Sequence, residues 1–171
     1  NSTDWFTASN WTPNGVPTAS NYVFIPNTTN SCLIASSSLL AYAKTITIYN
    51  GGKLDIDTIS TLNVTDKITV NTGGIFNLQS GASLIQTNNT TNTGTINVYR
   101  NSSKIILSDY TYWSSPTSGS QTLYSFSPDS NPKYFLRYSN GWIYLNASTT
   151  KFSPGTGYAI IAPIETDATN A

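Results

Sequence analysis

The sequence contains no histidine, no methionine and a single cysteine, and only 9% of its residues are charged. Without histidine the chain lacks the commonest general base, the serine and cysteine catalytic triads, and the usual zinc ligands. Cys32 has no histidine to activate it, so we interpret it as a small buried apolar side chain and not as a nucleophile. A lone cysteine also excludes an internal disulfide.

The few charges are balanced and scattered. Eight Lys and Arg residues match eight Asp and Glu residues, so the chain lacks the clustered basic face that nucleic-acid binding requires. No apolar run approaches the ~18 residues of a membrane-spanning helix. The sequence therefore predicts neither a nucleic-acid partner nor membrane insertion, and its polar surface must come from Ser, Thr and Asn.

What is present is a repeat of about 22 residues. The stretch NGGKLDID at 50–57 returns as NTGGIFNL at 71–78, and ITI at 46–48 returns as ITV at 68–70. A third copy, GTINV at 94–98, follows GIFNL at an offset of 20. Each unit holds three short segments in which apolar and polar residues alternate, and this period of two indicates β-strands.

Strands of three or four residues cannot bury their apolar side chains alone. Stacking the units places each strand about 4.8 Å from its copy, with Ile46 beside Ile68 and Leu54 beside Phe76. The sequence thus predicts an all-β protein with a short parallel β-helix over 21–100, with the Gly-Gly pairs at its corners. Phe24 lies 22 residues before Ile46, which suggests an earlier coil that includes 22–26 and 32–35.

Both ends of the stack differ from the coils. Residues 1–20 bring Trp5, Phe6 and Trp11, and we expect them to form an aromatic N-terminal cap. Of the 21 aromatic residues, 13 lie at or after Tyr99. We expect 101–164 to form an antiparallel β cap packed against the last coil, with 165–171 as a linker. Its strands are predicted within 104–109, 133–146 and 157–163, and Asn-Gly at 140–141 suits a type I′ hairpin loop. No helix is predicted, although 37–43 fits either a helical turn or another strand.

Two acidic residues raise the question of an enzyme. Asp55 and Asp57 alternate with apolar residues and point outward, about 6.6 Å apart, within the roughly 5–9.5 Å of glycoside-hydrolase pairs. An open strand face does not desolvate a carboxyl group, so we interpret both as solvating residues. A calcium site is an alternative, but calcium takes six to eight oxygens. We therefore expect no catalytic residue, no metal and no cofactor.

The aromatic residues are the other candidates. Trp113 and Trp142 are candidates for presenting rings to sugars, since aromatic faces bury the apolar faces of such ligands. Neighbouring phenols add hydroxyl groups: Tyr110, Tyr112, Tyr138 and Tyr144. We favour the other interpretation, in which these rings fill the core of the C-terminal sheet.

Several motifs resemble those of a known family. The opening NWTPNGVPTASNYVFIP at 10–26 looks like the start of β-helices in large secreted bacterial surface proteins. DYTYWSSP at 109–116, TLYSFSP at 122–128 and GTGYAIIAP at 155–163 resemble a module of Bacteroidota surface proteins. Those proteins use type IX, gliding-associated secretion and often act as adhesins. The resemblance implies an extracellular, cell-surface location within a longer polypeptide, and it brings no catalytic residue.

The predicted function is a non-enzymatic module of a surface adhesin or filament, which acts as a rigid display or attachment element. Its expected partners are other modules of the same polypeptide, surface glycans and neighbouring cells. A carbohydrate-binding module that uses Trp113, Trp142, Tyr112 and Tyr144 is the alternative, followed by a polysaccharide-degrading enzyme. Asp57-Thr58-Ile59 also resembles the Bacteroidota O-glycosylation signal, which implies a glycoprotein modified at Thr58.

Overall fold

The computed structural model describes residues 3–35 and 39–163, and the chain forms two compact units, Asn1–Asn101 and Ser102–Ala171. Regular structure is almost entirely β, as the sequence predicts. Among the described residues, no helix has the length and hydrophobicity to cross a membrane. The first unit holds the short 3-10 helix η1 (Ala8–Asn10) and ten strands: β1 (Tyr22–Ile25), β2 (Cys32–Ile34), β3 (Leu40–Ala43), β4 (Thr45–Ile48), β5 (Lys53–Ile56), β6 (Thr61–Val64), β7 (Ile68–Val70), β8 (Ile75–Leu78), β9 (Ser83–Gln86) and β10 (Asn97–Val98).

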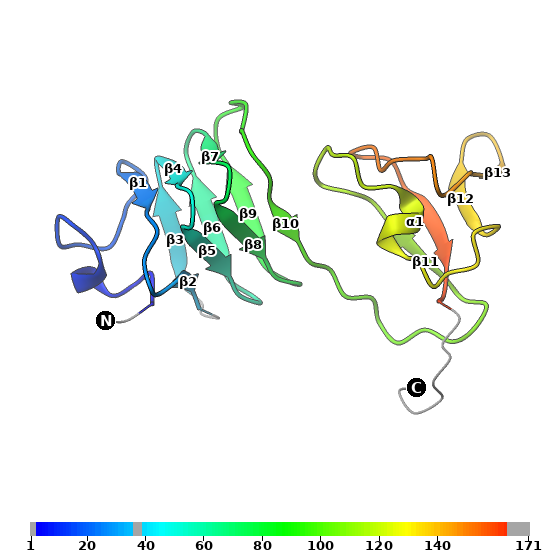
Figure 1. Cartoon of the computed structure of the whole chain (residues 1–171), viewed down its shortest axis with the longest axis horizontal. Helices are drawn as coiled ribbons and strands as arrows, with labels where there is room; N and C mark the ends of the chain where they lie inside the picture. Colours follow the sequence, from blue (N-terminus) through cyan, green and yellow to red (C-terminus); the bar gives the residue numbers. More distant parts are fainter. Residues whose placement is uncertain (1–2, 36–38, 164–171) are drawn as a thin grey trace. The chain divides into compact units, whose positions relative to one another are not determined.

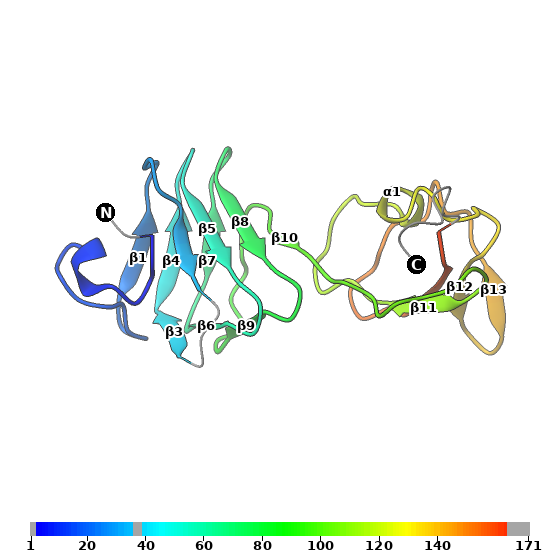
Figure 2. The same ribbon diagram turned by 90° about the horizontal axis from the view of Figure 1, so that it is seen from below.

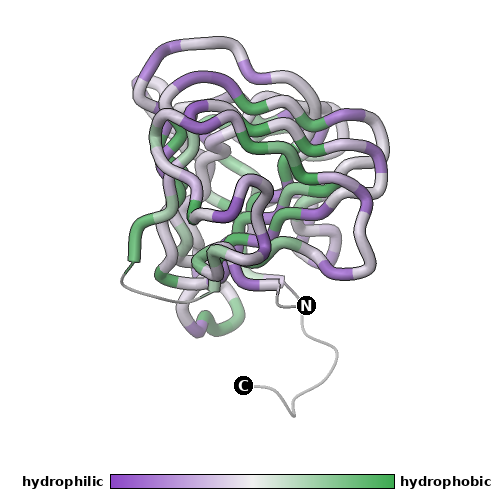
Figure 3. The backbone as a smooth tube through the Cα atoms, turned by 90° about the vertical axis from the view of Figure 1, so that its left-hand side faces the viewer, coloured by the Kyte–Doolittle hydropathy of each residue, from purple (hydrophilic) through white to green (hydrophobic). Residues whose placement is uncertain are grey.

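These strands stack as a parallel β-solenoid of about three turns (Figure 1). Each of three coils gives one strand to each of three parallel sheets, and β10 adds a fourth strand to one of them; the orders are β1-β4-β7, β2-β5-β8-β10 and β3-β6-β9 (Figure 2). Ile46 pairs with Ile68 and Leu54 with Phe76, which confirms the predicted ladders. The alternation of buried and exposed positions is visible as alternating hydropathy along the coils (Figure 3).

The Gly-Gly pairs lie at corners, as predicted. Gly51 and Gly73 have φ values of 76° and 82°, a region that favours glycine. A Cβ atom on Gly51 would lie 2.6 Å from the side chain of Asn27 in the preceding coil. The backbone of Gly52 similarly approaches the carbonyl of Ile25 so closely that no side chain fits between them. Glycine therefore lets successive coils stack in contact at this corner.

The aromatic N-terminal cap is confirmed. Trp5 is fully buried against the solenoid core, and its backbone N–H donates to the carbonyl of Leu33 at 2.8 Å. The indole Nε1 of Trp11 donates to the carbonyl of Trp5 at 2.8 Å, and the two rings meet edge to face at 4.8 Å. The cap thus covers the core and continues the hydrogen bonding of β2.

Coil length varies more than the repeat suggests. Phe24 pairs with Thr47 and not with Ile46, because the step from β1 to β4 is 23 residues. A shift of one residue turns every side chain to the opposite face, so Val23 is buried and Phe24 is exposed. Between the two interpretations of 37–43, the structure shows strand β3 from Leu40 onward, while 37 and 38 lie outside the described residues.

The second unit contains a four-stranded antiparallel sheet of β11 (Tyr110–Trp113), β14 (Tyr158–Ile161), β12 (Phe135–Tyr138) and β13 (Trp142–Tyr144), in that order. A strand within 104–109 is wrong: this segment is not regular, and Ile106 and Leu107 are exposed. The hairpin between β12 and β13 is confirmed. Its loop has three residues, 139–141, between the paired Tyr138 and Trp142, instead of a two-residue type I′ turn.

One short helix, α1 (Leu123–Phe126), was not predicted. The hydroxyl of Thr122 accepts from the N–H of Ser125 at 3.1 Å, and the Ser125 hydroxyl accepts from the N–H of Thr122 at 3.0 Å, which is a capping box. The helix covers the inner face of the sheet, where Leu123 and Phe135 are fully buried. The predicted packing of this sheet against the last coil stays a prediction.

Candidate functional site

The outer face of the C-terminal sheet is built from rows that the strand register sets side by side. Tyr112 of β11 pairs with Ala159 of β14. Ala159 in turn pairs with Leu136 of β12, and Leu136 pairs with Tyr144 of β13. Because paired residues point to the same side of a sheet, this row brings Tyr112 and Tyr144 to one face.

Neighbouring rows add four more rings to that face. Tyr138 lies two residues after Leu136 in β12 and pairs with Trp142. Tyr110 lies two residues before Tyr112 in β11 and pairs with Ile161. The carbonyl of Tyr134 accepts a hydrogen bond from the N–H of Ile161 at 3.2 Å, so Tyr134 extends the Tyr110 row. We call the following six residues the aromatic face: Tyr110, Tyr112, Tyr134, Tyr138, Trp142 and Tyr144.

The six rings form the solvent-facing layer of the sheet, since their exposed fractions run from 38% to 70%. Leu136 and Ala159 lie buried beneath them. The ring of Trp142 has its centroid 5.5 Å from that of Tyr138, with an interplanar angle of 75°. Trp142 also contacts Tyr112, with the two ring centroids 6.4 Å apart and an interplanar angle of 35°. Trp142, on the edge strand β13, therefore contacts a ring of the adjacent strand β12 and a ring of β11, the strand at the opposite edge of the sheet.

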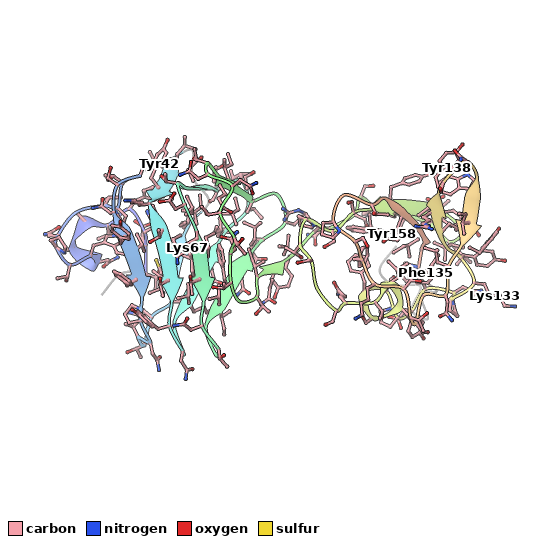
Figure 4. The ribbon with its side chains drawn as sticks, turned by 90° about the horizontal axis from the view of Figure 1, so that it is seen from above. Tyr42, Lys67, Lys133, Phe135, Tyr138 and Tyr158 are labelled. Carbon is pink, nitrogen blue, oxygen red and sulfur yellow. The ribbon has the colours of Figure 1, made fainter. Side chains whose placement is uncertain are left out.

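The inner face holds the other candidate tryptophan. Trp113 follows Tyr112 in β11 and so points to the opposite side, where its ring meets Phe126 at 5.0 Å and 70°. Figure 4 shows Tyr138 on the outer side of the sheet and Phe135 and Tyr158 on the inner side. Trp113 packs partly buried against this inner cluster. It is not part of the aromatic face, and its geometry favours the core alternative.

The aromatic face carries no formal charge. Its positions in β11 to β14 hold only aromatic and aliphatic residues, whereas Arg137 takes an alternate position in β12. Burial raises the pKa of Tyr110, and the nearby phenols of Tyr144 and Tyr134 raise it further. Tyr110 therefore stays protonated at neutral pH. The three phenols form a cluster of hydroxyl groups beside the rings around Trp142.

Asp55 and Asp57, the candidate hydrolase pair, are engaged in structural contacts. One oxygen of Asp55 accepts from the side-chain amide of Asn77 at 2.7 Å, and the other forms an ion pair with Lys53 at 3.0 Å. An Asp57 oxygen accepts from the backbone N–H of Thr58 at 2.7 Å. Asn77 in turn accepts from Asn97 at 2.9 Å, so Asp55 begins a side-chain ladder along the coils. Asp55 therefore stabilises the stacking of coils, and Asp57 stabilises the turn after β5.

Thr58, the candidate glycosylation residue, lies in the turn after β5 and is exposed. Ile59, the next residue, is also exposed and has a φ of 57°. The Asp57 hydrogen bond fixes the start of this turn. The motif is therefore accessible to a modifying enzyme, and its glycosylation stays a prediction.

Cys32 has no nucleophilic environment. Burial raises the pKa of its thiol to about 12, and the nearby carboxylates of Asp4 and Asp55 act in the same direction. The reactive thiolate is therefore disfavoured at neutral pH. Within 3–35 and 39–163, no group of three or more His, Cys, Asp or Glu side chains is placed to hold a metal ion.

A hollow beside the N-terminal cap is a feature that the sequence did not indicate. It has a volume of about 980 Å³ and is lined by cap residues such as Asn10 and Trp11 and by Tyr22, Phe24 and Asn27. Its lining combines polar groups, Asp4 among them, with two exposed rings of β1.

The profile of a family described as a domain of unknown function (DUF8693) matches residues 1–171. The chain belongs to this family. No curated protein and no solved structure matches the chain. The description of DUF8693 assigns no activity, so the aromatic face is the feature from which we infer a function for this member.

Proposed function

We propose that this chain is a non-enzymatic attachment module of an extracellular surface protein, and that it attaches through the aromatic face to carbohydrate. One observation carries the proposal: six exposed rings gather on one face of a small sheet whose opposite face already supplies the core. Exposed aromatic rings are costly to leave in water unless they serve a contact. The rings offer apolar faces, and their phenols offer hydrogen-bond donors and acceptors.

In this proposal the solenoid is the rigid part that carries the attachment sheet in a longer polypeptide. One row of its outward positions, Asp55, Asn77 and Asn97, bonds coil to coil. Such a stack gains its stiffness from contacts between neighbouring coils. The solenoid therefore contributes reach, and the C-terminal sheet contributes binding.

A polysaccharide-degrading role is less well supported. Catalysis by two carboxyl groups needs one of them protonated and free to donate to the leaving oxygen. Asp55 instead accepts from Asn77 and pairs with Lys53. Asp57 accepts a hydrogen bond from the backbone N–H of Thr58, so this contact belongs to the turn after β5 and not to a substrate site.

A glycan array tests the attachment role. The wild-type chain is expected to bind a subset of glycans, and Trp142→Ala is expected to lose most of that binding while its circular dichroism spectrum stays unchanged. Asp55→Asn is expected to bind as the wild type does. Absence of binding by a folded wild-type chain would contradict the proposal, and so would release of reducing ends from any bound glycan.

The extracellular location is tested on intact cells of the source organism. An antibody against the chain is expected to label unpermeabilised cells, and added protease is expected to remove the signal. Labelling that requires permeabilisation contradicts a surface role.

A further inference from the structure

The charge of the aromatic face bears on which carbohydrate it suits. Along β11, β14, β12 and β13, every position on this face is aromatic or aliphatic, and Arg137 lies at an alternate position. Binding an anionic sugar here would strip water from its carboxylate or sulfate without supplying a cation, which costs free energy. The face therefore favours a neutral ligand over an acidic one.

The spacing of the rings bears on the length of the ligand. Tyr138, Trp142 and Tyr112 form a linked series with centroids 5.5 and 6.4 Å apart. A pyranose ring is close in size to a phenol ring, so one sugar covers one of these rings and leaves its neighbours free. The hydroxyl cluster of Tyr110, Tyr134 and Tyr144 lies further along the same face. Full contact with the face requires several linked sugars.

We propose, on the basis of the function proposed above, that the ligand of the aromatic face is a neutral oligosaccharide or polysaccharide of several linked sugars, bound across the series Tyr138–Trp142–Tyr112. Trp142 and Tyr112, whose rings are tilted by 35° to each other, take the apolar faces of successive sugars, and Tyr138, which meets Trp142 edge to face, borders the bound sugars. The phenols of Tyr110, Tyr134 and Tyr144 exchange hydrogen bonds with their hydroxyl groups. No cation, anion or chain end is required for recognition.

Isothermal titration with oligosaccharides of increasing length tests this proposal. The probes are neutral gluco-, xylo- and manno-oligosaccharides from one to six sugars, together with acidic oligogalacturonates of the same lengths. For at least one neutral series we expect affinity to rise at least about tenfold between one and four sugars, and then to level off. This affinity is expected to be insensitive to salt, since no charges are paired.

Variants locate the effect. Trp142→Ala is expected to weaken binding of the four-sugar ligand about tenfold, equal to about 1.4 kcal/mol at 25 °C. Tyr138→Phe keeps the ring, and Tyr138→Ala removes it, so only the latter is expected to weaken binding strongly. Tyr124→Ala, which removes an exposed ring of α1 outside the aromatic face, is the matched control and is expected to bind as the wild type does.

The outcomes separate this inference from the proposed function. Equal or tighter binding of oligogalacturonates, or affinity that is complete with one sugar, overturns the neutral multi-sugar ligand and leaves carbohydrate attachment standing. Binding to no carbohydrate by the folded chain overturns both. Self-association that is lost in Trp142→Ala, without carbohydrate binding, also overturns both and assigns the face to a protein contact.

Discussion

One outward row of the solenoid and the outer face of the C-terminal sheet are built from different kinds of side chain. In the solenoid row that contains Asp55, Asn77 and Asn97, the outward side chains are polar and bond from one coil to the next. In the C-terminal sheet, the outward positions hold large rings that the core does not need, since Phe135 and Tyr158 fill the other face. Outward residues that serve the fold thus differ in kind from those that are free to serve a ligand.

Removing a core side chain from either region is expected to have the largest effect. Leu54→Ala and Phe135→Ala each delete a fully buried side chain, and we expect losses of about 3–5 kcal/mol in the stability of the unit concerned. Urea denaturation measures the free energy of unfolding, and hydrogen exchange in each unit shows which unit is destabilised. Because the two cores share no residue, Leu54→Ala is expected to speed labelling of Cys32, and Phe135→Ala is not. Equal effects of both variants on both units would contradict two separate cores.

The corner glycines test the close stacking of coils. Gly52→Ala forces a methyl group against the carbonyl of Ile25, and we expect it to cost about 1–3 kcal/mol in thermal or urea unfolding. Gly119→Ala, in the second unit, has open space around its Cβ and serves as the control, within about 0.5 kcal/mol of wild type. A neutral Gly52→Ala would show that the coils separate easily at this corner.

The side-chain ladder tests the structural use of outward polar residues. Asn77→Asp replaces the amide that donates to Asp55 with a second carboxylate, and we expect a loss of about 1–2 kcal/mol at pH 7. The loss is expected to shrink toward pH 4, because a protonated carboxyl restores the donor and removes the repulsion. Asn63→Asp, whose neighbours in the adjacent coils are Tyr42 and Ile85, is the control without a nearby carboxylate in its row. Equal pH profiles for the two variants would contradict the ladder.

The outward rings of the C-terminal sheet are expected to matter least for stability. Trp142→Ala removes a half-exposed ring, and we expect a loss below about 1 kcal/mol in urea unfolding together with the binding defect described above. A loss as large as that of Phe135→Ala would place Trp142 with the core and remove the contrast between the two regions.

The solenoid was predictable because its signal is local and repeated. The pairing of Leu54 with Phe76 follows from a fixed offset, and the period of two then sets the buried face. The displacement of Phe24 was not predictable, because one extra residue in a turn changes the register without changing the strand pattern. A repeat therefore predicts the architecture more reliably than it predicts which side chains of each strand are buried.

The aromatic face was predictable only in part. The alternation of residues in the sequence placed Trp142 and Tyr144 on one face of their strand, and Leu136 and Tyr138 on one face of the preceding strand. The rows that join β11 to β13 through β14 depend on pairing between segments far apart in sequence, which no local pattern encodes. For the same reason Trp113 and Trp142 were both candidates, although the register turns them to opposite faces.

Stacking in register also limits which residues can occupy the same position in two successive coils. Two carboxylates stacked 4.8 Å apart repel by about 1 kcal/mol in water and about 3 kcal/mol near a protein surface. A duplicated coil that keeps its Asp therefore weakens the stack, whereas one that changes it to Asn gains a hydrogen bond, as Asn77 does beside Asp55. Asn88 donates to Asp66 in the same way at 2.6 Å. Duplication of a coil thus favours a neutral amide, and not a second carboxylate, beside each Asp of the ladder.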